Sequence, residues 1–442
     1  MGVKEVLPIF PEDTKVDASN QLVIGGVKAT DLLKKYGSPL YVFDEDSLRR
    51  KAQEFQKEFR RLYPDTSVLY ASKAYINRPL ARLFADEGLG IDVVSGGELA
   101  IAKAAGFPLE RVYFHGNNKE AAELEMACDS RIGRVVVDNF HELELLNQIA
   151  KRKKIKQAIL LRVSPGVDPH THVKTTTGIL DSKFGFPVQT GDAEEAVHQA
   201  LKSSNLNLVG IHIHLGSPIY ELEPYALGVK VALEFVATMK KKHGLKFEEF
   251  SPGGGFAIQY LSNAAIPTVA QYARTIADAV LSNCKRLGLK PPKLVIEPGR
   301  AMVGRAGVAL YTVGSSKNIP GIRKYVAVDG GMGDNIRPAI YGSLYEALVA
   351  NRVNAGKEGE EKVTIAGKYC ESGDILIKDV TLPKLTPGDV IAIPASGAYC
   401  LSMASNYNAS LRPPIVLVSK GNSRLIRRRE TYADLMRTDV MD

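Results

Sequence analysis

A lysine at the end of a short apolar run is the first residue whose position in this chain suggests chemistry. The run from Ser67 to Ala71 reads as a buried strand, and Lys73 follows it. An ammonium group avoids burial unless it is paired or takes part in a reaction. A single lysine of this kind is most often a solvated loop residue, so its meaning depends on what the chain places at equivalent positions.

Seven further apolar runs follow at a spacing typical of strands that alternate with helices. Helical patterns over 79–87, 98–105 and 140–151 separate some of them, and a longer helical pattern over 44–63 precedes them all. Eight such strands predict a (β/α)8 barrel of about 250 residues. We therefore expect an α/β barrel domain over 41–307, with runs ending at Ala71, Ser95, His115, Asp138, Val163, His214, Phe250 and Ile296.

The pattern changes after Gly307. Short strand-like runs separated by Gly and Pro replace the alternation of strands and helices, which is typical of a β domain. The sequence predicts an antiparallel β-sheet or barrel over 308–442 together with 1–40, so that the α/β barrel is an insertion. The expected strands lie at 308–313, 325–329, 363–366, 375–377, 390–393 and 415–418.

Polar residues and glycines gather at the predicted carboxyl ends of the barrel strands, where barrel enzymes carry their active sites. Glycines after strands seven and eight let backbone N–H groups approach an anion, as a phosphate site requires. A lysine together with a phosphate cradle suggests pyridoxal phosphate, held as a Schiff base. The residues at these ends are Lys73, Asp92, His115, Arg162, His212, His214, Ser217, Gly253, Gly254, Gly255, Glu297, Gly299 and Arg300.

Glu297 and His214 indicate the type of reaction. A carboxylate beside the pyridine nitrogen favours the protonated ring, which is the stronger electron sink and suits decarboxylation. A histidine at position 214 is more often a core residue with satisfied hydrogen bonds, but beside a cofactor its flat ring could stack on the pyridine.

Composition excludes several other classes of protein. The 442 residues carry a net charge of +8, with 57 basic and 49 acidic side chains, and the basic clusters lack interleaved aromatics, so a nucleic-acid site is not expected. No apolar stretch reaches the roughly 18 residues that span a bilayer, and no secretory signal is visible. Four cysteines without metal-type spacing predict free thiols, no metal site and a cytoplasmic location: Cys128, Cys284, Cys370 and Cys400.

At this point the chain resembles a known family, the fold-type-III pyridoxal-phosphate-dependent decarboxylases, and among them most closely the diaminopimelate decarboxylases. The resemblance covers nearly the whole chain, in family order. The motifs are YASK (70–73), DVVSGGEL (92–99), FHGNNK (114–119), DSKFG (181–185), HIHLGS (212–217), GGG (253–255), EPGR (297–300), RPAIYG (337–342), CESGD (370–374) and SNYN (405–408).

The resemblance implies a role for each matching residue. Lys73 is expected to form the Schiff base, His214 to stack on the ring, and Glu297 to pair with the pyridinium. Asp92 and Arg162 are expected to support the cofactor near its hydroxyl group and the lysine. The phosphate would be held by Ser217, Gly253, Gly254, Gly255, Gly299 and Tyr407, and substrate groups by Arg300, Arg337, Tyr341 and Tyr407. Cys370 and Glu371 would come from the partner subunit of a homodimer.

The implied reaction is decarboxylation of meso-2,6-diaminopimelate at its D-configured carbon to L-lysine and carbon dioxide, the last step of lysine biosynthesis. The non-reacting end of this substrate needs a cation for its carboxylate and an acid for its ammonium, which Arg300 or Arg337 together with Glu371 can supply. Either Cys370 or Lys73 could return the proton. Cys370 could instead be an interior thiol, and Arg337 a structural ion-pair partner.

Three alternatives stay open. The first is a decarboxylase of the same fold acting on ornithine, arginine or carboxynorspermidine, and the second is a non-catalytic pyridoxal-phosphate-binding protein. The third is an amino-acid racemase, which would be expected to have a cation where this chain has Glu297. The role of the 166–192 insert, with His170 and His172, is also open.

Two departures from the family pattern affect the expected shape of the pocket. Residues 74–77 are bulkier than usual, and Ser251-Pro252 precedes the glycine triplet where an Asp–apolar pair is frequent.

Overall fold

The structure is a computed structural model that describes residues 3–169, 171–354 and 359–441. The chain divides into two compact units. The barrel unit comprises Lys51–Ala257 and Ile266–Ala301, and the β unit comprises Met1–Arg50, Ile258–Ala265 and Met302–Asp442. The sequence-based domain boundaries, after residues 40 and 307, stay a prediction.

Eight parallel strands close on themselves in the barrel unit. Each pairs with its neighbour in chain order, β8 pairs with β9, and the last strand returns to the first through the register Leu294↔Thr66. A short ninth strand, β10 (Phe186–Pro187), adds to the edge of β9. The barrel strands are β5 (Thr66–Ala71), β6 (Gly90–Val93), β7 (Val112–Phe114), β8 (Arg134–Val137), β9 (Gln157–Ser164), β11 (Leu206–His212), β12 (Glu249–Gly253) and β13 (Lys293–Ile296).

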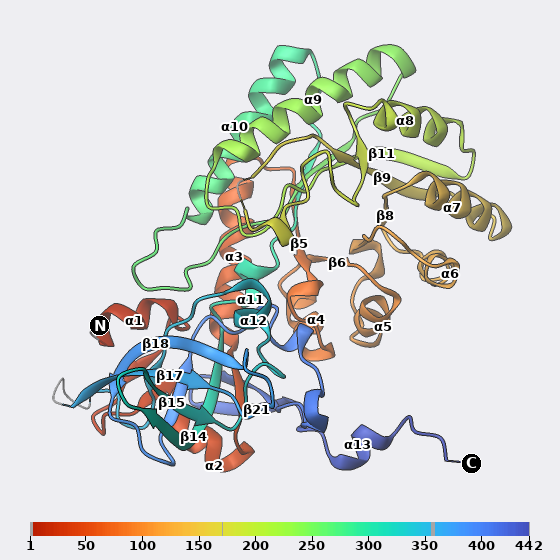
Figure 1. Ribbon diagram of the computed structural model, residues 1–442. Helices are drawn as coiled ribbons and strands as arrows, with labels where there is room; N and C mark the ends of the chain where they lie inside the picture. The colour runs from red at the N-terminus through yellow and green to blue at the C-terminus, as the bar shows by residue number, and fades with distance from the viewer. Residues whose placement is uncertain (1–2, 170, 355–358, 442) are drawn as a thin grey trace. The chain divides into compact units, whose positions relative to one another are not determined.

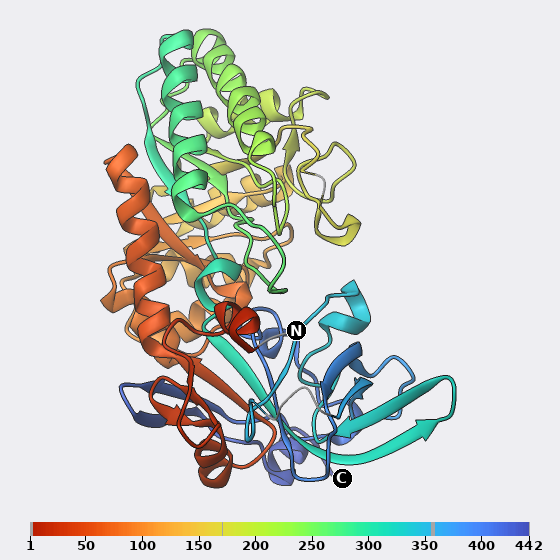
Figure 2. The same ribbon diagram turned by 90° about the vertical axis from the view of Figure 1, so that its left-hand side faces the viewer.

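Helices follow the strands and surround the barrel (Figure 1). The two longest that lie wholly in this unit, α9 and α10, run side by side in both views (Figure 1, Figure 2), and an ion pair between Arg286 and Glu234 joins them at 2.7 Å. The helices are α3 (Glu45–Leu62), α4 (Arg78–Asp86), α5 (Gly96–Ala104), α6 (Ala121–Asp129), α7 (Phe140–Arg152), α8 (Asp192–Lys202), α9 (Glu223–His243), α10 (Val269–Leu287) and α11 (Arg300–Val303), with 3-10 turns η2 (Ser72–Ala74), η3 (Leu109–Arg111) and η4 (Val173–Thr175).

Polar caps start several of these helices immediately after the strand that precedes them. The side chains of Asn77, Ser95 and Asn139 each accept a hydrogen bond from the backbone N–H three residues later. A cap at this position ends the loop and fixes where the helix begins. The strand-to-helix connections are therefore short, and the side chains at the strand ends are held in place.

A layer of apolar side chains fills the interior of the barrel. It draws one residue from each of six strands, so the barrel is a packed core and not a pore. The layer consists of Leu69, Tyr113, Val136, Leu160, Val209 and Val295. Polar side chains at the carboxyl ends of the strands consequently border an apolar interior, and the low dielectric constant there strengthens their electrostatic interactions.

The β unit contains a mixed sheet in the order β18-β17-β15-β14-β4-β20-β21, with β19 and β16 attached through β14. Two pairs, β4–β20 and β15–β17, are parallel and the others are antiparallel. Figure 2 shows the long strand β14 paired with β15. The strands are β4 (Leu40–Asp44), β14 (Gly307–Ile319), β15 (Arg323–Val328), β16 (Leu348–Val349), β17 (Glu360–Ala366), β18 (Ile375–Pro383), β19 (Val390–Ile393), β20 (Ile415–Ser419) and β21 (Asn422–Arg427).

The N-terminal segment packs on this sheet. Its apolar residues, including Phe10, Leu22 and Leu32, share one buried core with Val308 and Val416 of the sheet strands. The remaining elements of the unit are α1 (Val3–Val6), η1 (Leu7–Ile9), β1 (Lys15–Val16), β2 (Leu22–Ile24), β3 (Val27–Lys28), α2 (Ala29–Tyr36), α12 (Arg337–Tyr341), η5 (Leu401–Met403), η6 (Tyr407–Ala409) and α13 (Tyr432–Met436).

The predicted fold class is confirmed: a TIM-like barrel accompanied by a second sheet unit. The second sheet is mostly antiparallel, as expected, with the two parallel pairs as an addition. Several barrel strands end one or two residues earlier than the apolar runs, so that His115 and His214 lie in loops just beyond β7 and β11. In the described part of the chain, no helix combines the length and the apolar composition needed to cross a membrane.

The 166–192 insert folds back along the end of β9. Its strand β10 pairs with that end, and the backbone N–H of Gly185 donates to Asp138 Oδ1 at 2.9 Å. His172 is exposed, and its Nδ1 accepts a hydrogen bond from the N–H of Lys174, which makes it a local cap. His170 lies outside the described residues.

Candidate active site

The predicted cofactor residues of the barrel unit lie at the carboxyl ends of its strands. Lys73 is in the 3-10 turn after β5, Asp92 is in β6, Arg162 is in β9, and Glu297 follows β13. Because the strands are parallel and the barrel is closed, these ends form one rim. The ion pair between Lys73 Nζ and Asp92 Oδ2, at 3.9 Å, crosses from the end of one strand to the next.

Asp92 is a buried carboxylate with unused hydrogen-bonding capacity. Its side chain is 1% exposed, and neither oxygen has a hydrogen-bond partner among the residues that the structure describes. Burial raises the pKa of Asp92 to about 7, against the opposing attraction of Lys73. Such an orphaned carboxylate beside a lysine fits a site that is completed by a polar ligand.

Asp92→Asn is expected to stabilise the protein without cofactor, and increasingly so as the pH rises. A carboxyl whose pKa is raised from 3.8 in the unfolded chain to about 7 in the folded chain costs stability once the pH exceeds the unfolded value, and the cost levels off above the folded value. The advantage of Asn should therefore grow by roughly 2 to 3 kcal/mol between pH 5 and pH 8. Chemical denaturation at several pH values measures it.

The exposed Asp86 on α4 provides the matched control, since Asp86→Asn should change stability little at any pH. A loss of stability for Asp92→Asn at pH 8 would show that the ion pair with Lys73 outweighs the cost of burying the carboxylate.

Arg162 is buried beneath the 166–192 insert. Its guanidinium lies 4.3 Å from the ring centroid of Phe184 and its Nη1 is 3.7 Å from Asp138 Oδ2. A Cβ on Gly185 would come 2.8 Å from the carbonyl oxygen of Arg162, so only glycine allows this approach. The insert therefore covers and orients Arg162, a role that its sequence left open.

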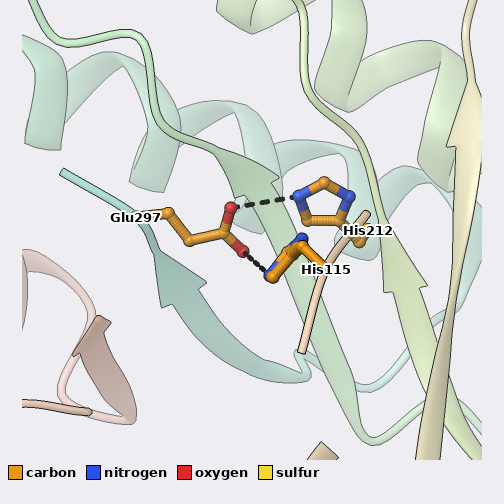
Figure 3. A group of neighbouring side chains, drawn as sticks. All are labelled: His115, His212 and Glu297. Carbon is orange, nitrogen blue, oxygen red and sulfur yellow. Dashed lines mark hydrogen bonds and ion pairs between the residues drawn. The ribbon is translucent and has the colours of Figure 1, made fainter. Parts of the chain in front are cut away.

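Glu297 is held by three side chains from other strands of the barrel: Ser251 in β12, His212 in β11 and His115 just after β7. Ser251 Oγ donates to its Oε1 at 2.7 Å. His212 Nε2 lies 3.1 Å from its Oε2, and His115 Nε2 lies 3.6 Å from its Oε1 (Figure 3). Burial alone would raise the pKa of Glu297, but the attraction of His212 and His115 and the hydrogen bonds from His212 and Ser251 hold it below the ordinary value. Glu297 is thus a buried anion at neutral pH.

The glycine triplet forms a tightly packed loop between β12 and its neighbours. A Cβ on Gly254 would lie 2.3 Å from the carbonyl oxygen of Glu297, and Gly253 has a φ of +82°, which disfavours other residues. Tyr225 Oη donates to the carbonyl oxygen of Gly254 at 2.8 Å, which fixes the loop from beneath. The close contacts of all three glycines leave no room for larger side chains in this loop, as expected of a loop whose backbone approaches a ligand.

His214 and Ser217 lie beside this loop. The N–H of Gly254 donates to His214 Nδ1 at 3.3 Å, so Nδ1 carries no proton, and removal from water lowers the pKa of His214 well below its ordinary value. Its ring is therefore neutral and fixed in orientation. The guanidinium of Arg300 lies 3.4 Å from Ser217 Oγ through Nε and Nη2, and a Cβ on Gly299 would clash with Ala71.

These residues fit pyridoxal phosphate. Lys73 and the buried anion Glu297 follow the adjacent strands β5 and β13, and the flat neutral ring of His214 and the glycine loop belong to the same rim of the barrel unit. The orphaned oxygens of Asp92 add a position for a polar group. The individual cofactor roles of these residues stay a prediction.

The β unit holds the remaining predicted residues, among them Arg337 in α12. Arg337 is 6% exposed, and its guanidinium donates to Tyr260 Oη at 2.9 Å and to Ser343 Oγ at 3.1 Å. No carboxylate of the described residues lies within ion-pair distance of it. Burial opposes its charge, but the neighbouring Tyr260 and Tyr345 raise the pKa of Arg337 above its ordinary value. Its charge is thus not neutralised within the described chain, which disfavours a purely structural ion pair. Tyr341 ends the same helix and is half-buried.

Cys370, Glu371 and Tyr407 form one exposed cluster of the β unit. Tyr407 Oη lies 3.7 Å from Cys370 Sγ and donates to Glu371 Oε2 at 3.2 Å. Asn408 also contacts the thiol, through Nδ2 at 3.0 Å. The hydrogen bond with Cys370 is the first cause that raises the pKa of Tyr407 to about 12. The thiol is exposed, which argues against an interior structural cysteine.

Asp374 was not among the predicted residues, although it ends the CESGD motif. Its carboxylate accepts hydrogen bonds from the N–H of Met332 at 2.6 Å and from the N–H of Tyr369 at 2.8 Å. It therefore ties the loop before Arg337 to the loop that carries Cys370. Ser251 and Tyr225 were missed in the same way. Ser251 was visible only as a departure from the family pattern, and nothing in the sequence marked Tyr225.

Residues 45–304 match the family described as pyridoxal-dependent decarboxylase, pyridoxal binding domain. The chain belongs to the family of pyridoxal-dependent decarboxylases. It is 46% identical over 419 residues to the diaminopimelate decarboxylase of Bacillus subtilis (strain 168), which is 95% of each chain.

Solved structures of diaminopimelate decarboxylases support the same family assignment. The diaminopimelate decarboxylase from M. jannaschii, in complex with L-lysine, has a TM-score of 0.92 at 37% identity and covers 98% of both chains. The enzyme from Helicobacter pylori, complexed with L-lysine, has a TM-score of 0.84 at 31% identity over 92% of this chain and 98% of that chain. The predicted family and the expected cofactor are confirmed.

Proposed function

We propose that the protein decarboxylates meso-2,6-diaminopimelate to L-lysine and carbon dioxide with pyridoxal phosphate, the last step of lysine biosynthesis. The observation that carries the reaction type is Glu297, a buried carboxylate kept ionised by Ser251 and His212. An anion at this end of the site suits full protonation of a pyridine nitrogen, which decarboxylation needs. The choice of substrate is supported by the names of the relatives at 46% identity.

The barrel unit would hold the cofactor. Lys73 Nζ would bind it covalently, and the neutral His214 would lie against the ring. The glycine triplet would line the phosphate site together with Ser217, Gly299 and Arg300. Tyr407 of the β unit, which lies with Cys370 and Glu371, would add a hydroxyl to the phosphate. When bound, pyridoxal phosphate accepts the electron pair that remains on the α-carbon after carbon dioxide leaves. Glu297 then holds a proton on the ring nitrogen by pairing with its positive charge.

Arg337 supports recognition of a substrate with a second carboxylate. Its buried guanidinium fork has neutral partners only among the described residues, so a substrate carboxylate would supply the missing counter-charge. Arg300 and Tyr341 would assist, and Glu371 would bind the distal ammonium. A diamine-forming decarboxylase has no use for this arginine.

Two groups could return a proton to the α-carbon. Lys73 Nζ would be one of them, because its amine at the carboxyl end of β5 can carry a proton. Cys370 is the other, exposed on the β unit with Asn408 Nδ2 3.0 Å from its sulfur. We propose that Cys370 and Glu371 act in the site of the partner subunit of a homodimer, so that each site is completed by two chains. Four free thiols support a reducing, cytoplasmic location.

Turnover assays test the proposed function. The purified protein is supplied with pyridoxal phosphate and meso-diaminopimelate, and carbon dioxide and lysine are measured in parallel. We expect equal amounts of both products, and turnover of ornithine, arginine and carboxynorspermidine at least about 100-fold slower, because these substrates leave buried charged groups of the site unpaired.

Turnover of one of these three alternative substrates without turnover of diaminopimelate would contradict the proposed substrate and retain the reaction type. Absence of any carbon dioxide, with the cofactor bound, would contradict the reaction type and favour a binding protein.

A further inference from the structure

Glu297 shares the barrel rim with two buried histidines whose roles the cofactor chemistry does not assign. His115 follows β7, and His212 is the last residue of β11. Their rings meet edge to face at 4.8 Å between centroids, and both point at the Glu297 carboxylate (Figure 3). The exposed fractions are 4% for His115 and 1% for His212, so all three groups are removed from water.

The hydrogen bond to Glu297 fixes the tautomer of His212. An ionised carboxylate can only accept, so His212 Nε2, 3.1 Å from Oε2, must carry the proton. Its Nδ1 has no hydrogen-bond partner among the residues that the structure describes. A second proton on Nδ1 would be a buried donor without an acceptor, which favours the neutral Nε2–H form. Ser251 completes the arrangement, because its hydroxyl donates to Oε1 at 2.7 Å and accepts from the N–H of Gly253 at 3.1 Å.

His115 backs this pair. Its Nε2 lies 3.6 Å from Glu297 Oε1 and 3.9 Å from Asp92 Oδ1, between the two buried carboxylates. Burial lowers the pKa of His115 well below its ordinary value, so the ring is neutral. Its edge-to-face contact with His212 restricts the rotation of that ring and keeps Nε2 directed at Glu297.

A neutral hydrogen-bond donor and a cation beside Glu297 would affect the charge of its carboxylate differently. A lysine or arginine at hydrogen-bond distance would neutralise the carboxylate and compete with a positively charged ligand. Imidazole and hydroxyl donors stabilise the anion and leave its charge available. The carboxylate can thus stay ionised in a dry site and still pair with a protonated ring nitrogen.

The same three residues also have the composition of a metal site, since two imidazoles and a carboxylate offer ligand atoms within 4.8 Å of one another. Zinc ligands at about 2.0 to 2.2 Å lie roughly 3.3 Å apart, so the set would have to contract. The proton on His212 Nε2 also occupies the lone pair that a metal would need. The hydrogen bond therefore accounts for the cluster better than a metal does.

We propose that His212, backed by His115, is a positioning residue that holds Glu297 ionised and directed so that the cofactor's ring nitrogen stays protonated. The proposal rests on the proposed function only for its catalytic consequence. Loss of the His212 donor leaves Glu297 with Ser251 as its remaining donor and favours the neutral carboxyl. The ring nitrogen then loses its counter-charge and its proton.

The test measures the protonation of the ring nitrogen directly. The protein is reconstituted with pyridoxal phosphate labelled with 15N in the ring, and the 15N chemical shift is recorded for the wild type, His212→Ala, His212→Gln and His115→Ala. We expect a protonated nitrogen in the wild type, a shift toward the unprotonated form in both alanine variants, and recovery in His212→Gln, whose amide can donate to Glu297. Glu297→Gln supplies the unprotonated reference, and His141→Ala, at an exposed position on α7, is the matched control.

Kinetics give a second readout in the same variants. His212→Ala should lower kcat about 10- to 100-fold with little change in KM, as expected when a residue acts through another. A wild-type 15N shift together with a wild-type kcat in cofactor-saturated His212→Ala would overturn the proposal. If no amino acid is turned over, the 15N shift still tests the proposal, so its failure and failure of the proposed function are distinguishable.

If a variant does not retain the cofactor, the proposal can still be tested on the apoprotein. NMR of 15N-histidine-labelled wild-type apoprotein should show His212 as the neutral Nε2–H tautomer, and Glu297→Ala should abolish its hydrogen-bonded proton signal. An imidazolium or an Nδ1–H tautomer at His212 in the wild type would overturn the proposal.

Discussion

Lys73→Ala is expected to lower turnover by at least about three orders of magnitude and to remove the visible absorbance of the lysine-bound cofactor. The reason is that Nζ of this residue is the proposed covalent anchor at the carboxyl end of β5. The side chain is 38% exposed and faces the buried Asp92 across 3.9 Å, so it can be reached by an aldehyde and is attracted toward the site. Absorbance spectra and carbon dioxide release measure the two losses.

The fold of this variant should survive. Removing Lys73 takes away a charge that opposes the raised pKa of Asp92, so Asp92 protonates more readily and no uncompensated anion is left buried. Lys103→Ala, at an exposed position on α5, is the matched control and should behave as the wild type. Normal turnover with an unchanged spectrum in Lys73→Ala would show that the anchor lies elsewhere.

Two inactive variants regain activity when they are mixed, if the sites are shared between subunits. One is Lys73→Ala, and the other replaces both Cys370 and Glu371 by alanine. After unfolding and refolding together in equal amounts, half of the dimers contain one chain of each kind, and each of these dimers has one site with no substitution. We expect about one quarter of the wild-type activity. The assay is carbon dioxide release from the refolded mixture.

The control for this experiment pairs Lys73→Ala with Glu297→Gln. Both residues belong to the barrel unit, so every site in a mixed dimer carries one of the two substitutions and no activity should return. The cluster of Cys370 with Glu371 and Tyr407 belongs to the other unit of the chain. Recovery in neither mixture, with exchange of subunits demonstrated, would place Cys370 and Glu371 in the site of their own chain.

Much of the barrel could be predicted because its signals are local. Each apolar run is short enough to be a buried strand, and the residues that end it, such as Lys73 and Asp92, take their position from the strand itself. The prediction lost accuracy by one or two residues at the strand ends, as at His214, because apolar character continues beyond the last hydrogen bond of the strand.

Residues that act by long-range contact could not be predicted in this way. Ser251 meets Glu297 across 46 positions, and Asp374 meets Met332 across 42. Each contact exists only because the barrel closes or because two loops of the β unit meet. The sequence shows the serine and the aspartate but not the atoms they face.

The kinds of groups available to the site follow from the order of residues alone: one amine, two carboxylates, three histidines, a glycine cradle and the arginines. How these groups are charged depends on the contacts that folding creates. Asp92 and Glu297 are both buried carboxylates, yet the pKa of Asp92 is raised to about 7 and that of Glu297 is lowered. The reason is that His212 and His115 attract the Glu297 anion and His212 and Ser251 donate hydrogen bonds to it, whereas the oxygens of Asp92 have no hydrogen-bond donor among the described residues.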